Sequence, residues 1–436
     1  MSRGETTPDV LIVGGGAVGL MTALELARRG ARPLLLERSP DLTAGCTVGS
    51  AGLLSPGHST PLATPQSLRQ GILYMFRRDS PFSLRPRPRL VPWLLRYMAA
   101  CTADRVRTGT RILQELSVAS LEMHRALAAE GLDTGFTRRG AINVYETERA
   151  FEAGRREAMT LERSGINSQV LALSEARALE PAIGTVTGAV FYPEEAHCEP
   201  ARFLAAVIGA ARDAGVEVRT GVEVLAVRRR GARIERVETT DGSYAPNTMV
   251  LAAGVWSGGL ARSLGLRIPL EGGKGYHVDL ARTPTDPSIP IYLHEARVIA
   301  TPFDGVLRLA GTLQLTGLDE RIDDVRVQAT LAAGIRTLNG VGGRPVVDVW
   351  GGIRPCTPDG LPVIGSPNAV TNLVVATGHA MKGLHLAPIT GRLVAEALAG
   401  DPPSFDLAPM HPDRFRLPFG RRQPAVGRPE RRASPS

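Results

Sequence analysis

Cysteine is scarce in this sequence, and the cysteines are nowhere closely spaced. Only four occur in 436 residues, without a C-x-x-C spacing: Cys46, Cys101, Cys198 and Cys356. Their scatter argues against a disulfide framework, a structural zinc site and a dithiol redox centre. Each is therefore expected to be a reduced, packed thiol, and no metal site is predicted.

Long apolar runs are absent as well. No run of 18 or more apolar residues lacks charge, which argues against a membrane-spanning helix. The run from Val10 to Met21 could pass for part of a signal peptide, but several glycines interrupt it and it continues into a helical pattern. It also lacks a small-residue cleavage site, so a cytoplasmic protein is expected.

Lysine is nearly missing: only Lys274 and Lys382 occur, each in a glycine-rich stretch that chance alone could explain. The net charge of +8 is local. Residues 69–107 hold nine arginines against two aspartates and residues 413–436 hold seven against two acids, which leaves the rest at −4. This distribution does not indicate a nucleic-acid-binding body. Residues 69–107 would suit peripheral contact with a membrane or an ordinary arginine-rich helical surface, and 413–436 are predicted to be a disordered tail.

The first 37 residues predict a β-α-β unit. Val10–Val13 reads as a buried strand, Ala17–Arg29 as a helix stopped by Gly30, and Leu34–Leu36 as a second strand. Such a unit begins a parallel sheet. The predicted class is therefore α/β.

The rest of the chain alternates between α/β stretches and two insertions of different character. Helices are expected over 110–130, 147–164, 201–214 and 384–398, with strands at 141–145, 216–219, 222–228, 233–238, 249–252, 276–280, 298–300, 307–310 and 373–376. Asp241-Gly242 is a hairpin signal. We expect a Rossmann-like nucleotide domain of three segments (1–90, 187–262, 346–412) and an α+β substrate domain with a mixed sheet (91–186, 263–345).

A glycine-rich turn joins the first strand to the first helix. Gly14 to Gly19 supply G-x-G-x-x-G: Gly14 permits the turn, Gly16 lets a pyrophosphate approach the helix N-terminus, and Gly19 allows close packing. Glu37, at the end of the second strand, can bind a ribose diol. Strand, helix and acid together predict a dinucleotide site. A glycine turn without a ligand is the alternative.

The remainder of the chain favours FAD over NAD. No second G-x-G-x-x-G follows a strand, as a flavin enzyme that also binds NAD would often show. The small, polar stretch 45–52 could lie along a pyrophosphate or a flavin ring. The strand before Ala252, Ala253 and Gly254 ends in small residues, so something large is expected to approach there.

Several motifs, in order, resemble the D-amino acid oxidase and dehydrogenase family, which includes glycine oxidase and sarcosine oxidase-like flavoenzymes. Besides the N-terminal fingerprint they are Ser50-Ala51-Gly52, LAAGVW (251–256), RLAGT (308–312), WGGIRPCTPDGLPVIG (350–365) and TGHAMKGLHLAPITG (377–391). They cover most of residues 9–400. The resemblance implies an FAD domain and a substrate domain. GHAMKG and the 69–107 segment look closer to bacterial D-amino acid and D-hydroxyproline dehydrogenases than to eukaryotic oxidases.

The resemblance also implies site residues. Arg354 matches the arginine that pairs with the substrate carboxylate, against the alternative of a structural arginine. Tyr276 could give that carboxylate a second hydrogen bond or be a packed strand aromatic. His58 could shape the pocket or be a plain loop histidine. Lys382 would stabilise the reduced flavin or face solvent. Met381 stands where glycine oxidase-like members carry an arginine, which weakens glycine as substrate.

The flavin is expected to be noncovalent, because Gly352 and not Cys356 aligns with the cysteine that holds the flavin in sarcosine oxidase-like members. The predicted cofactor-binding residues are Gly14, Gly16, Ala17, Val18, Gly19, Glu37, Arg38, Ser50, Ala51, Gly52, Val224, Ala253, Gly254, Gly378, Met381, Lys382, Gly383 and Leu384.

The function expected from these features is FAD-dependent oxidation of a small amino acid. Arg354 would anchor the carboxylate while hydride passes from Cα to flavin N5, giving an imine or keto acid. A D-amino acid or a cyclic D-imino acid, such as D-proline or D-hydroxyproline, is the expected substrate, with oxygen or a quinone as acceptor. A glycine or sarcosine oxidase, a 2-hydroxy acid oxidoreductase and a flavin-binding protein without turnover stay open. So do contact with the inner face of the membrane and the oligomeric state.

Overall fold

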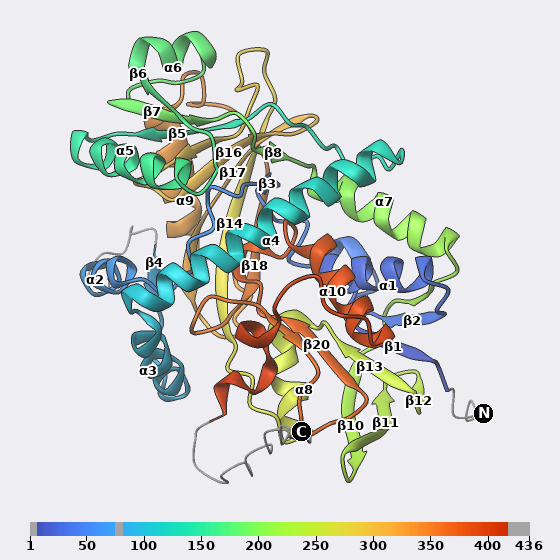
Figure 1. The fold of residues 1–436 in the computed structure, drawn as a ribbon. Helices are drawn as coiled ribbons and strands as arrows, with labels where there is room; N and C mark the ends of the chain where they lie inside the picture. The colour runs from blue at the N-terminus through green and yellow to red at the C-terminus, as the bar shows by residue number, and fades with distance from the viewer. Residues whose placement is uncertain (1–6, 75–81, 417–436) are drawn as a thin grey trace, which may run out of the picture.

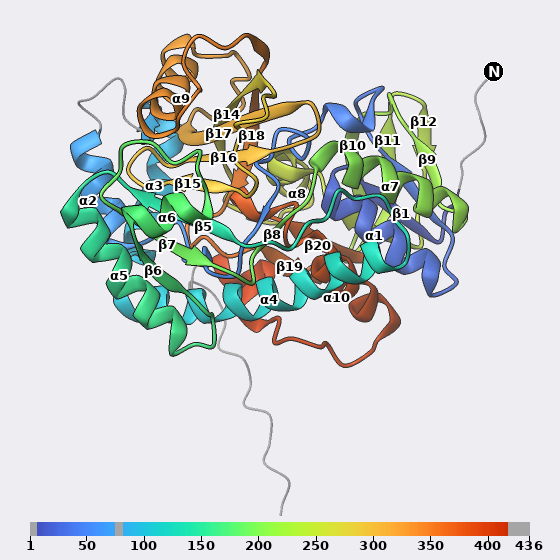
Figure 2. The same cartoon turned by 90° about the horizontal axis from the view of Figure 1, so that it is seen from above.

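The structure is a computed structural model that describes residues 7–74 and 82–416, and it contains two large sheets side by side (Figure 1, Figure 2). The parallel sheet has the order β19-β20-β13-β1-β2-β9, in which only β19 runs antiparallel to its neighbour. Its strands are β1 (Val10–Val13), β2 (Pro33–Leu36), β9 (Glu217–Arg219), β13 (Thr248–Leu251), β19 (Val363–Gly365) and β20 (Leu373–Thr377). The predicted β-α-β start is confirmed.

Strand β1 shows how both faces of this sheet are buried. Val10 and Ile12 pack toward α1 (Ala17–Arg28), α7 (Pro200–Asp213) and α10 (Ala387–Ala399). Leu11 and Val13 point the other way, where they meet α8 (Ser257–Ser263) and a three-stranded sheet. That sheet is β10 (Val224–Arg230), β11 (Arg233–Thr239) and β12 (Gly242–Tyr244); the hairpin predicted from Asp241-Gly242 turns at residues 240 and 241, and Gly242 is the first residue of β12.

The mixed sheet runs β18-β14-β17-β16-β15-β5-β7-β6, with β4 added beside β17. Its strands are β4 (Phe82–Leu84), β5 (Ala141–Tyr145), β6 (Gln169–Ala172), β7 (Gly188–Tyr192), β14 (Glu271–Ala281), β15 (Ile291–Leu293), β16 (Val298–Pro302), β17 (Val306–Leu315) and β18 (Val346–Cys356). Helices α5 (Glu148–Glu162) and α6 (Leu173–Leu179) pack against one end. The predicted α/β class with a mixed second sheet is confirmed.

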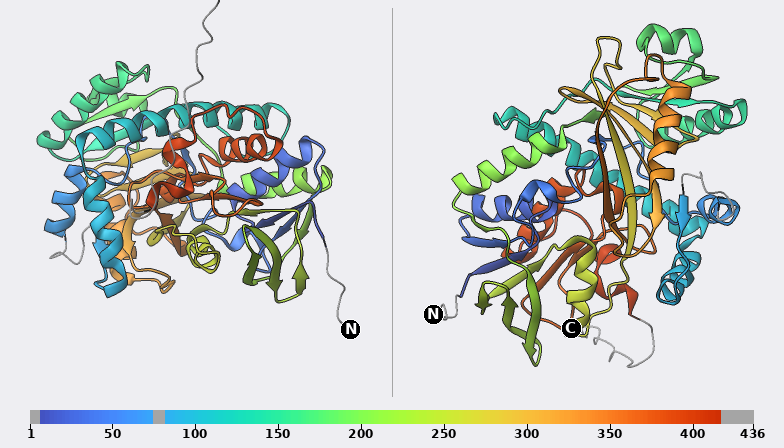
Figure 3. Two further views of the ribbon diagram at one scale, coloured as in Figure 1. Left: turned by 60° about the horizontal axis from the view of Figure 1, so that its bottom comes forward. Right: turned by 180° about the vertical axis from the view of Figure 1, so that it is seen from behind.

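Helix α9 (Asp324–Thr337) lies within a stretch that the sequence predicted to be rich in strands. Its N-terminus is capped by Asp323, whose side chain accepts a hydrogen bond from the backbone N–H of Val325. Its buried face packs on β14 and β17, as the orange helix beside the long strands shows in Figure 3. The helical pattern was overlooked because strands flank it on both sides.

Helix α4 (Ala103–Ala129) connects the two halves and crosses one side of the molecule (Figure 1). Its 27 residues span about 40 Å. It begins seven residues before the predicted start, because the Thr102 side chain caps Arg105 N–H. Helices α2 (Pro65–Tyr74) and α3 (Val91–Ala100) precede it, and β3 (Leu53–Leu54) pairs with β8 (Ala196–His197).

The strand pairings differ from the predicted domain boundaries. Residues 82–84, 188–192 and 346–356 were assigned to the nucleotide domain, yet β4, β7 and β18 belong to the mixed sheet. Sequence pattern does not reveal which sheet a strand joins, because partners are chosen by long-range packing. Strand β18 runs from one sheet toward the other, where it contacts the short helices η3 (Gly254–Trp256) and η4 (Ala380–Lys382).

The described residues include only part of the predicted disordered tail and of the basic segment 69–107. Of the predicted disordered tail, residues 413–416 are ordered: Pro412–Phe415 is a short helix, and Arg414 pairs with Asp359 at 2.8 Å. Residues 417–436 lie outside the described residues, as do 75–81 of the basic segment. Within the described part, no helix has the length and apolarity needed to cross a bilayer.

Candidate active site

A cavity of about 1550 Å³ extends between the two sheets. It begins at the glycine-rich turn after β1, passes the loop of residues 44–51 and ends against β15, β17 and β18 of the mixed sheet. A single small ligand usually occupies about 300–1,000 Å³. The space is therefore suited to a dinucleotide together with a second, smaller molecule.

The glycines after β1 shape one end of this cavity. Gly14 has a φ of 113°, and a Cβ there would lie 2.5 Å from the Ala252 carbonyl oxygen. A Cβ on Gly19 would lie 1.9 Å from the Gly14 carbonyl oxygen, so Gly19 serves close packing and does not line the cavity. At Gly16 the nearest atom would be Thr47 Oγ1 at 3.9 Å, which leaves space at the N-terminus of α1 for a phosphate group.

Glu37 stands at the end of β2 with its carboxylate fixed. Gly15 N–H donates to Oε2 at 2.7 Å and Ser39 N–H to Oε1 at 2.9 Å. The group lines the cavity, where its remaining acceptor capacity suits a ribose diol. Arg38 also lines the cavity and lies over the Trp256 ring, 3.6 Å from its centroid.

The loop of residues 46–50 crosses the cavity and is held by an ion pair in the mixed sheet. Arg308 on β17 pairs with Asp279 on β14 through two hydrogen bonds of 2.8 Å. The same guanidinium donates to the carbonyl oxygens of Val48 and Ser50 at 2.6 and 3.1 Å. At the start of the loop, Thr47 Oγ1 accepts from Ala17 N–H at 3.3 Å. The loop is thus fixed between α1 and the mixed sheet.

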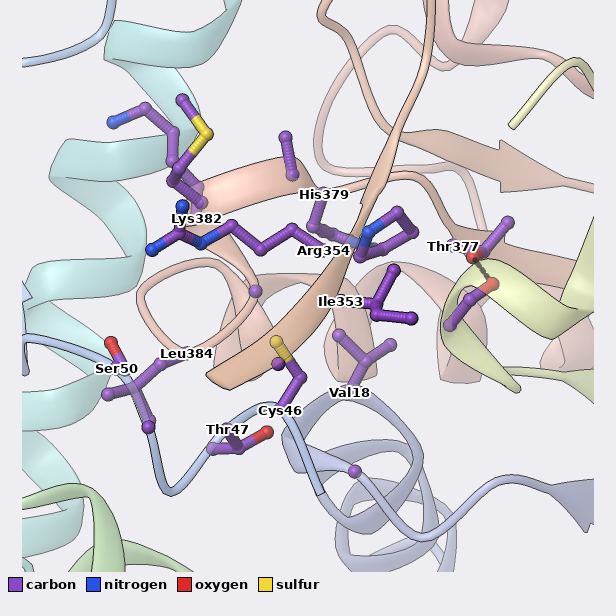
Figure 4. A pocket seen from close by; sticks show the side chains of 18 of the residues that line it. Val18, Cys46, Thr47, Ser50, Ile353, Arg354, Thr377, His379, Lys382 and Leu384 are labelled. Atoms are coloured by element: carbon purple, nitrogen blue, oxygen red, sulfur yellow. Dashed lines mark hydrogen bonds between the residues drawn. The ribbon is translucent and has the colours of Figure 1, made fainter. Parts of the chain in front are cut away.

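Arg354 projects from β18 into the cavity, between η4 and the loop that carries Cys46 to Ser50 (Figure 4). Its Nη1 donates to the Thr312 carbonyl oxygen at 2.7 Å, and no carboxylate among the described residues pairs with it. Thr312 has a φ of 61°, which is strained for a threonine and turns its carbonyl toward the guanidinium. The other guanidinium N–H groups are left to bind an anion in two parallel hydrogen bonds.

Lys382 and His58 also line the cavity, and they lie close enough together for the charge of the lysine to act on the imidazole. Burial lowers the pKa of Lys382 to about 8, an effect that Glu195 opposes. Burial, with the charge of Lys382, lowers the pKa of His58 to about 3, so its imidazole is neutral at neutral pH. Burial also lowers the pKa of Arg354, but the guanidinium keeps its positive charge.

Most predicted site residues line this cavity. They are Gly14, Gly16, Ala17, Val18, Glu37, Arg38, Ser50, Ala51, Val224, Ala253, Gly254, Met381, Gly383 and Leu384, with His58, Arg354 and Lys382. Gly52 and Gly378 do not line it. Both have positive φ angles and pack against Cys198 and Thr357, so they shape the adjoining loops instead.

Tyr276 corrects one prediction, because it does not reach the cavity. Its ring is fully buried, and its hydroxyl donates to Gln314 Oε1 at 2.8 Å. Lys274 and Tyr276 share one face of β14, whereas Gly275 between them faces Arg354. Tyr276 therefore gives no hydrogen bond to a molecule beside Arg354, and Lys274 is likewise directed away, toward the Arg321 carbonyl oxygen.

Three residues that line the cavity were not predicted from the sequence: Tyr292, His294 and Arg297. No strand was predicted at β15, although the alternation Tyr292-Leu293-His294 puts both rings on one side. Arg297 has a φ of 54° and donates to the Tyr292 hydroxyl at 3.2 Å. This wall makes the end of the cavity polar and aromatic.

A dinucleotide cleft that leads to an arginine without a carboxylate partner among the described residues fits the class of flavoprotein oxidoreductases. The family model described as FAD dependent oxidoreductase matches residues 9–397, and the chain belongs to this family. FAD is thus its cofactor, and the residues around Gly16 and Glu37 fit that group. The family resemblance found in the motifs is confirmed.

Individual relatives match over nearly their whole lengths. A D-amino acid dehydrogenase of Paramagnetospirillum magneticum is 30% identical over 93% of this chain and 98% of the relative. D-amino acid dehydrogenase 2 of Ralstonia nicotianae is 32% identical over 92% and 99%. Among solved structures, glycine oxidase from Geobacillus kaustophilus superposes with a TM-score of 0.77 at 26% identity, covering 94% of this chain and 99% of its own.

Proposed function

We propose that the protein oxidises a small amino acid at Cα, with a D-amino acid or a cyclic D-imino acid as substrate. D-Proline and D-hydroxyproline are the first candidates. Support for the D-configuration comes from the relatives named D-amino acid dehydrogenase, which are 30–32% identical over at least 92% of the chain. Met381 stands where an arginine is expected for glycine as substrate, so glycine is the weaker candidate.

One observation carries the proposal: Arg354 enters the cavity without a carboxylate partner among the described residues. A substrate carboxylate would supply that partner through two parallel hydrogen bonds. The guanidinium lies flat over Gly275, where a Cβ would approach Cζ to 2.1 Å, so its orientation is constrained. Fixing the carboxylate also fixes the direction of the Cα–H bond.

FAD supplies the two-electron acceptor that takes the α-hydrogen as hydride. The chain's own residues bind and orient the substrate. Arg354 would hold the carboxylate, while Tyr292 and His294 line the same cavity and Lys382 adds positive charge to it. Ser50 and Thr47, on the loop that Arg308 fixes, line the same cavity.

The test is anaerobic reduction of the holoprotein by single compounds: D-proline, D-hydroxyproline, D-alanine, glycine, sarcosine and a set of 2-hydroxy acids. Bleaching of the yellow flavin by D-imino or D-amino acids supports the proposal. Bleaching by hydroxy acids alone would make the protein a 2-hydroxy acid oxidoreductase, and no bleaching would indicate flavin binding without turnover. Arg354→Ala should raise KM sharply, and unchanged kinetics would contradict the role of Arg354.

We also propose that the protein binds an anionic lipid surface, because helix α3 exposes apolar side chains next to arginines. Such binding would favour a membrane-bound electron acceptor. Helix α3 exposes Val91, Leu95 and Met98, by 51%, 57% and 46%, and their spacing puts them on one face. Arg89 just before the helix and Arg96 within it supply positive charge for lipid headgroups. Tyr97 of the same helix lines the cavity. Helix α3 would therefore stand between the cavity and a quinone bound at this surface. Oxygen is the alternative acceptor.

A further inference from the structure

Behind His58, a line of polar side chains leads from the cavity into the protein. His58 has 29% of its side chain exposed toward the cavity, while Glu195 has only 2% exposed. Ser55 lies between them and is itself 3% exposed. The pairing of β3 with β8 explains this proximity, because it brings residues 140 positions apart to adjacent places.

The hydrogen bonds along this line are continuous. The Ser55 hydroxyl donates to Glu195 Oε1, and Gly57 N–H donates to the same oxygen at 3.1 Å. His58 Nδ1 lies 2.7 Å from Ser55 Oγ. Because the serine proton is directed at the carboxylate, Nδ1–H must be the donor to Ser55. Nε2 of His58 is therefore the acceptor, and it lies 3.2 Å from the Asn143 amide nitrogen.

The charge of this line resides on Glu195. Burial raises the pKa of Glu195 to about 7, although the bonds from Ser55 and Gly57 and the charge of Lys382 act against the rise. The pKa of His58 is about 3, so the imidazole passes protons without storing one at neutral pH. Glu195 Oε2 is buried and has no hydrogen-bond partner among the described residues. An unpaired carboxylate oxygen in such a place can accept a proton.

An amino acid must lose an ammonium proton before hydride can leave Cα, because the nitrogen lone pair drives the formation of the imine. We propose that Glu195 is the final acceptor of that proton, which reaches it through His58 and Ser55. This rests on the function proposed above. Glu195 does not touch the substrate; it acts through the two residues between them.

The transfer balances without a further reactant. An ammonium N–H bond breaks and an Nε2–H bond forms on His58, directly or through one water molecule. The Nδ1–H bond breaks as the Ser55 O–H bond forms, and the original serine proton passes to Glu195. The imidazole ends in its other tautomer, where rotation of the Asn143 amide lets Oδ1, which has no partner among the described residues, accept from Nε2–H. The hydride that later leaves Cα is a separate transfer and does not alter this balance of protons.

Several charged groups face the line and will contribute to its pH dependence. Lys382 approaches Glu195 and His58 from η4, and Tyr192 approaches Glu195 from β7. His294 and Arg297 face His58 from the β15–β16 wall. Of these groups only Lys382, with a pKa of about 8, titrates near that of Glu195. Removing Lys382 should raise the pKa of Glu195. Removing Glu195 should abolish the pH dependence that the Glu195 carboxyl causes.

The experiment measures anaerobic flavin reduction in the holoenzyme against pH, with the amino acid that bleaches it best. The wild-type rate should rise with pH through about 7, where Glu195 ionises. Glu195→Gln, which keeps the size and the bond to Ser55, should lower the neutral-pH rate about 100-fold and remove this rise, with substrate affinity unchanged. Ser55→Ala should do the same while leaving the carboxylate in place. Lys382→Met should shift the rise to higher pH.

A spectroscopic readout accompanies the rates. Infrared difference spectra of the wild type should gain the C=O band of a protonated carboxyl when substrate is added above pH 7, and Glu195→Gln should lack it. The matched control is Glu180→Gln: Glu180 is also 2% exposed and hydrogen-bonded to a serine, Ser288, but lies outside the cavity. The pH profile of Glu180→Gln should equal that of the wild type.

Two failures can be told apart. If no amino acid bleaches the wild type, the proposed function is wrong and this proposal is overturned with it. If the wild type is bleached but Glu195→Gln and Ser55→Ala, both loaded with FAD, keep its rate and pH profile, only the proton route is wrong. A loss confined to substrate affinity would also overturn the route, since it would make Glu195 a merely structural support of His58.

Discussion

Gly275 lies directly beneath Arg354. A Cβ at position 275 would come within 2.1 Å of the guanidinium carbon and one terminal nitrogen. The absence of a side chain at Gly275 thus creates the place in which the Arg354 guanidinium rests. This relationship joins two strands that pair over ten positions, so the orientation of Arg354 is a property of the mixed sheet.

Gly275→Ala should therefore displace Arg354 without unfolding the protein, because the clash is with the movable end of a side chain. The loss of one or two charged hydrogen bonds predicts a fall in kcat/KM of about 10- to 100-fold, mostly through KM. Steady-state kinetics with the FAD content measured in parallel test this. Gly209→Ala on α7, where a Cβ would meet nothing within 4 Å, is the control and should behave as wild type. Unaltered kinetics in Gly275→Ala would contradict the argument.

The flavin should be released completely when the protein is denatured. Gly352 occupies the position at which a covalent cysteine is expected, and a Cβ there would lie 1.9 Å from the Trp350 ring. Cys356 is fully buried, and burial raises the pKa of the Cys46 thiol, which keeps it protonated and weakly nucleophilic. After acid precipitation, all absorbance at flavin wavelengths should be in the supernatant. A yellow pellet that becomes colourless in Cys46→Ser would identify Cys46 as an attachment site.

Stability should depend on pH through Glu195. Its pKa is about 7 in the folded protein against 4.5 as the ordinary value, so the unfolded chain releases this proton first as pH rises. The carboxyl therefore lowers stability between pH 4.5 and 7, by up to about 3 kcal/mol. Glu195→Gln should match the wild type in acid and be more stable above pH 8, where Lys382 is mostly neutral. Denaturant unfolding in acid and above pH 8 measures the free energy of unfolding of both proteins. If the variant and the wild type differ by the same free energy at the two pH values, the prediction is wrong.

Leu95→Glu should weaken binding to anionic vesicles. It places a negative charge in the centre of the exposed α3 face, which removes apolar insertion and opposes the arginines beside it. Co-sedimentation with vesicles that contain phosphatidylglycerol, compared with pure phosphatidylcholine, measures the effect. Met159→Glu on α5 is the matched control, because Met159 is also 57% exposed on a helix. If the wild type sediments with neither vesicle, the membrane proposal is wrong.

The sequence predicted the dinucleotide end of the site well and the substrate end only in part. Gly14, Gly16 and Glu37 lie within a local strand–turn–helix unit, so their geometry follows from neighbours in the chain. Tyr276 was misplaced because successive side chains of a strand point to opposite faces, and the sequence does not show which face of β14 lines the cavity. Glu195 was missed because an acidic pair before β8 looks like a surface loop until β3 pairs with it and buries it.

The sequence by itself determined the α/β class, the FAD cleft and the arginine that enters the cavity, Arg354. Each depends on short motifs whose residues act together within a few turns of chain. The tertiary structure alone decided that Gly275 underlies Arg354, that Tyr292 and His294 line the same cavity, and that Glu195 stands two hydrogen bonds behind His58. These contacts join strands far apart in the chain, and their partners are selected by the packing of two sheets, a physical choice that no local pattern of residues records.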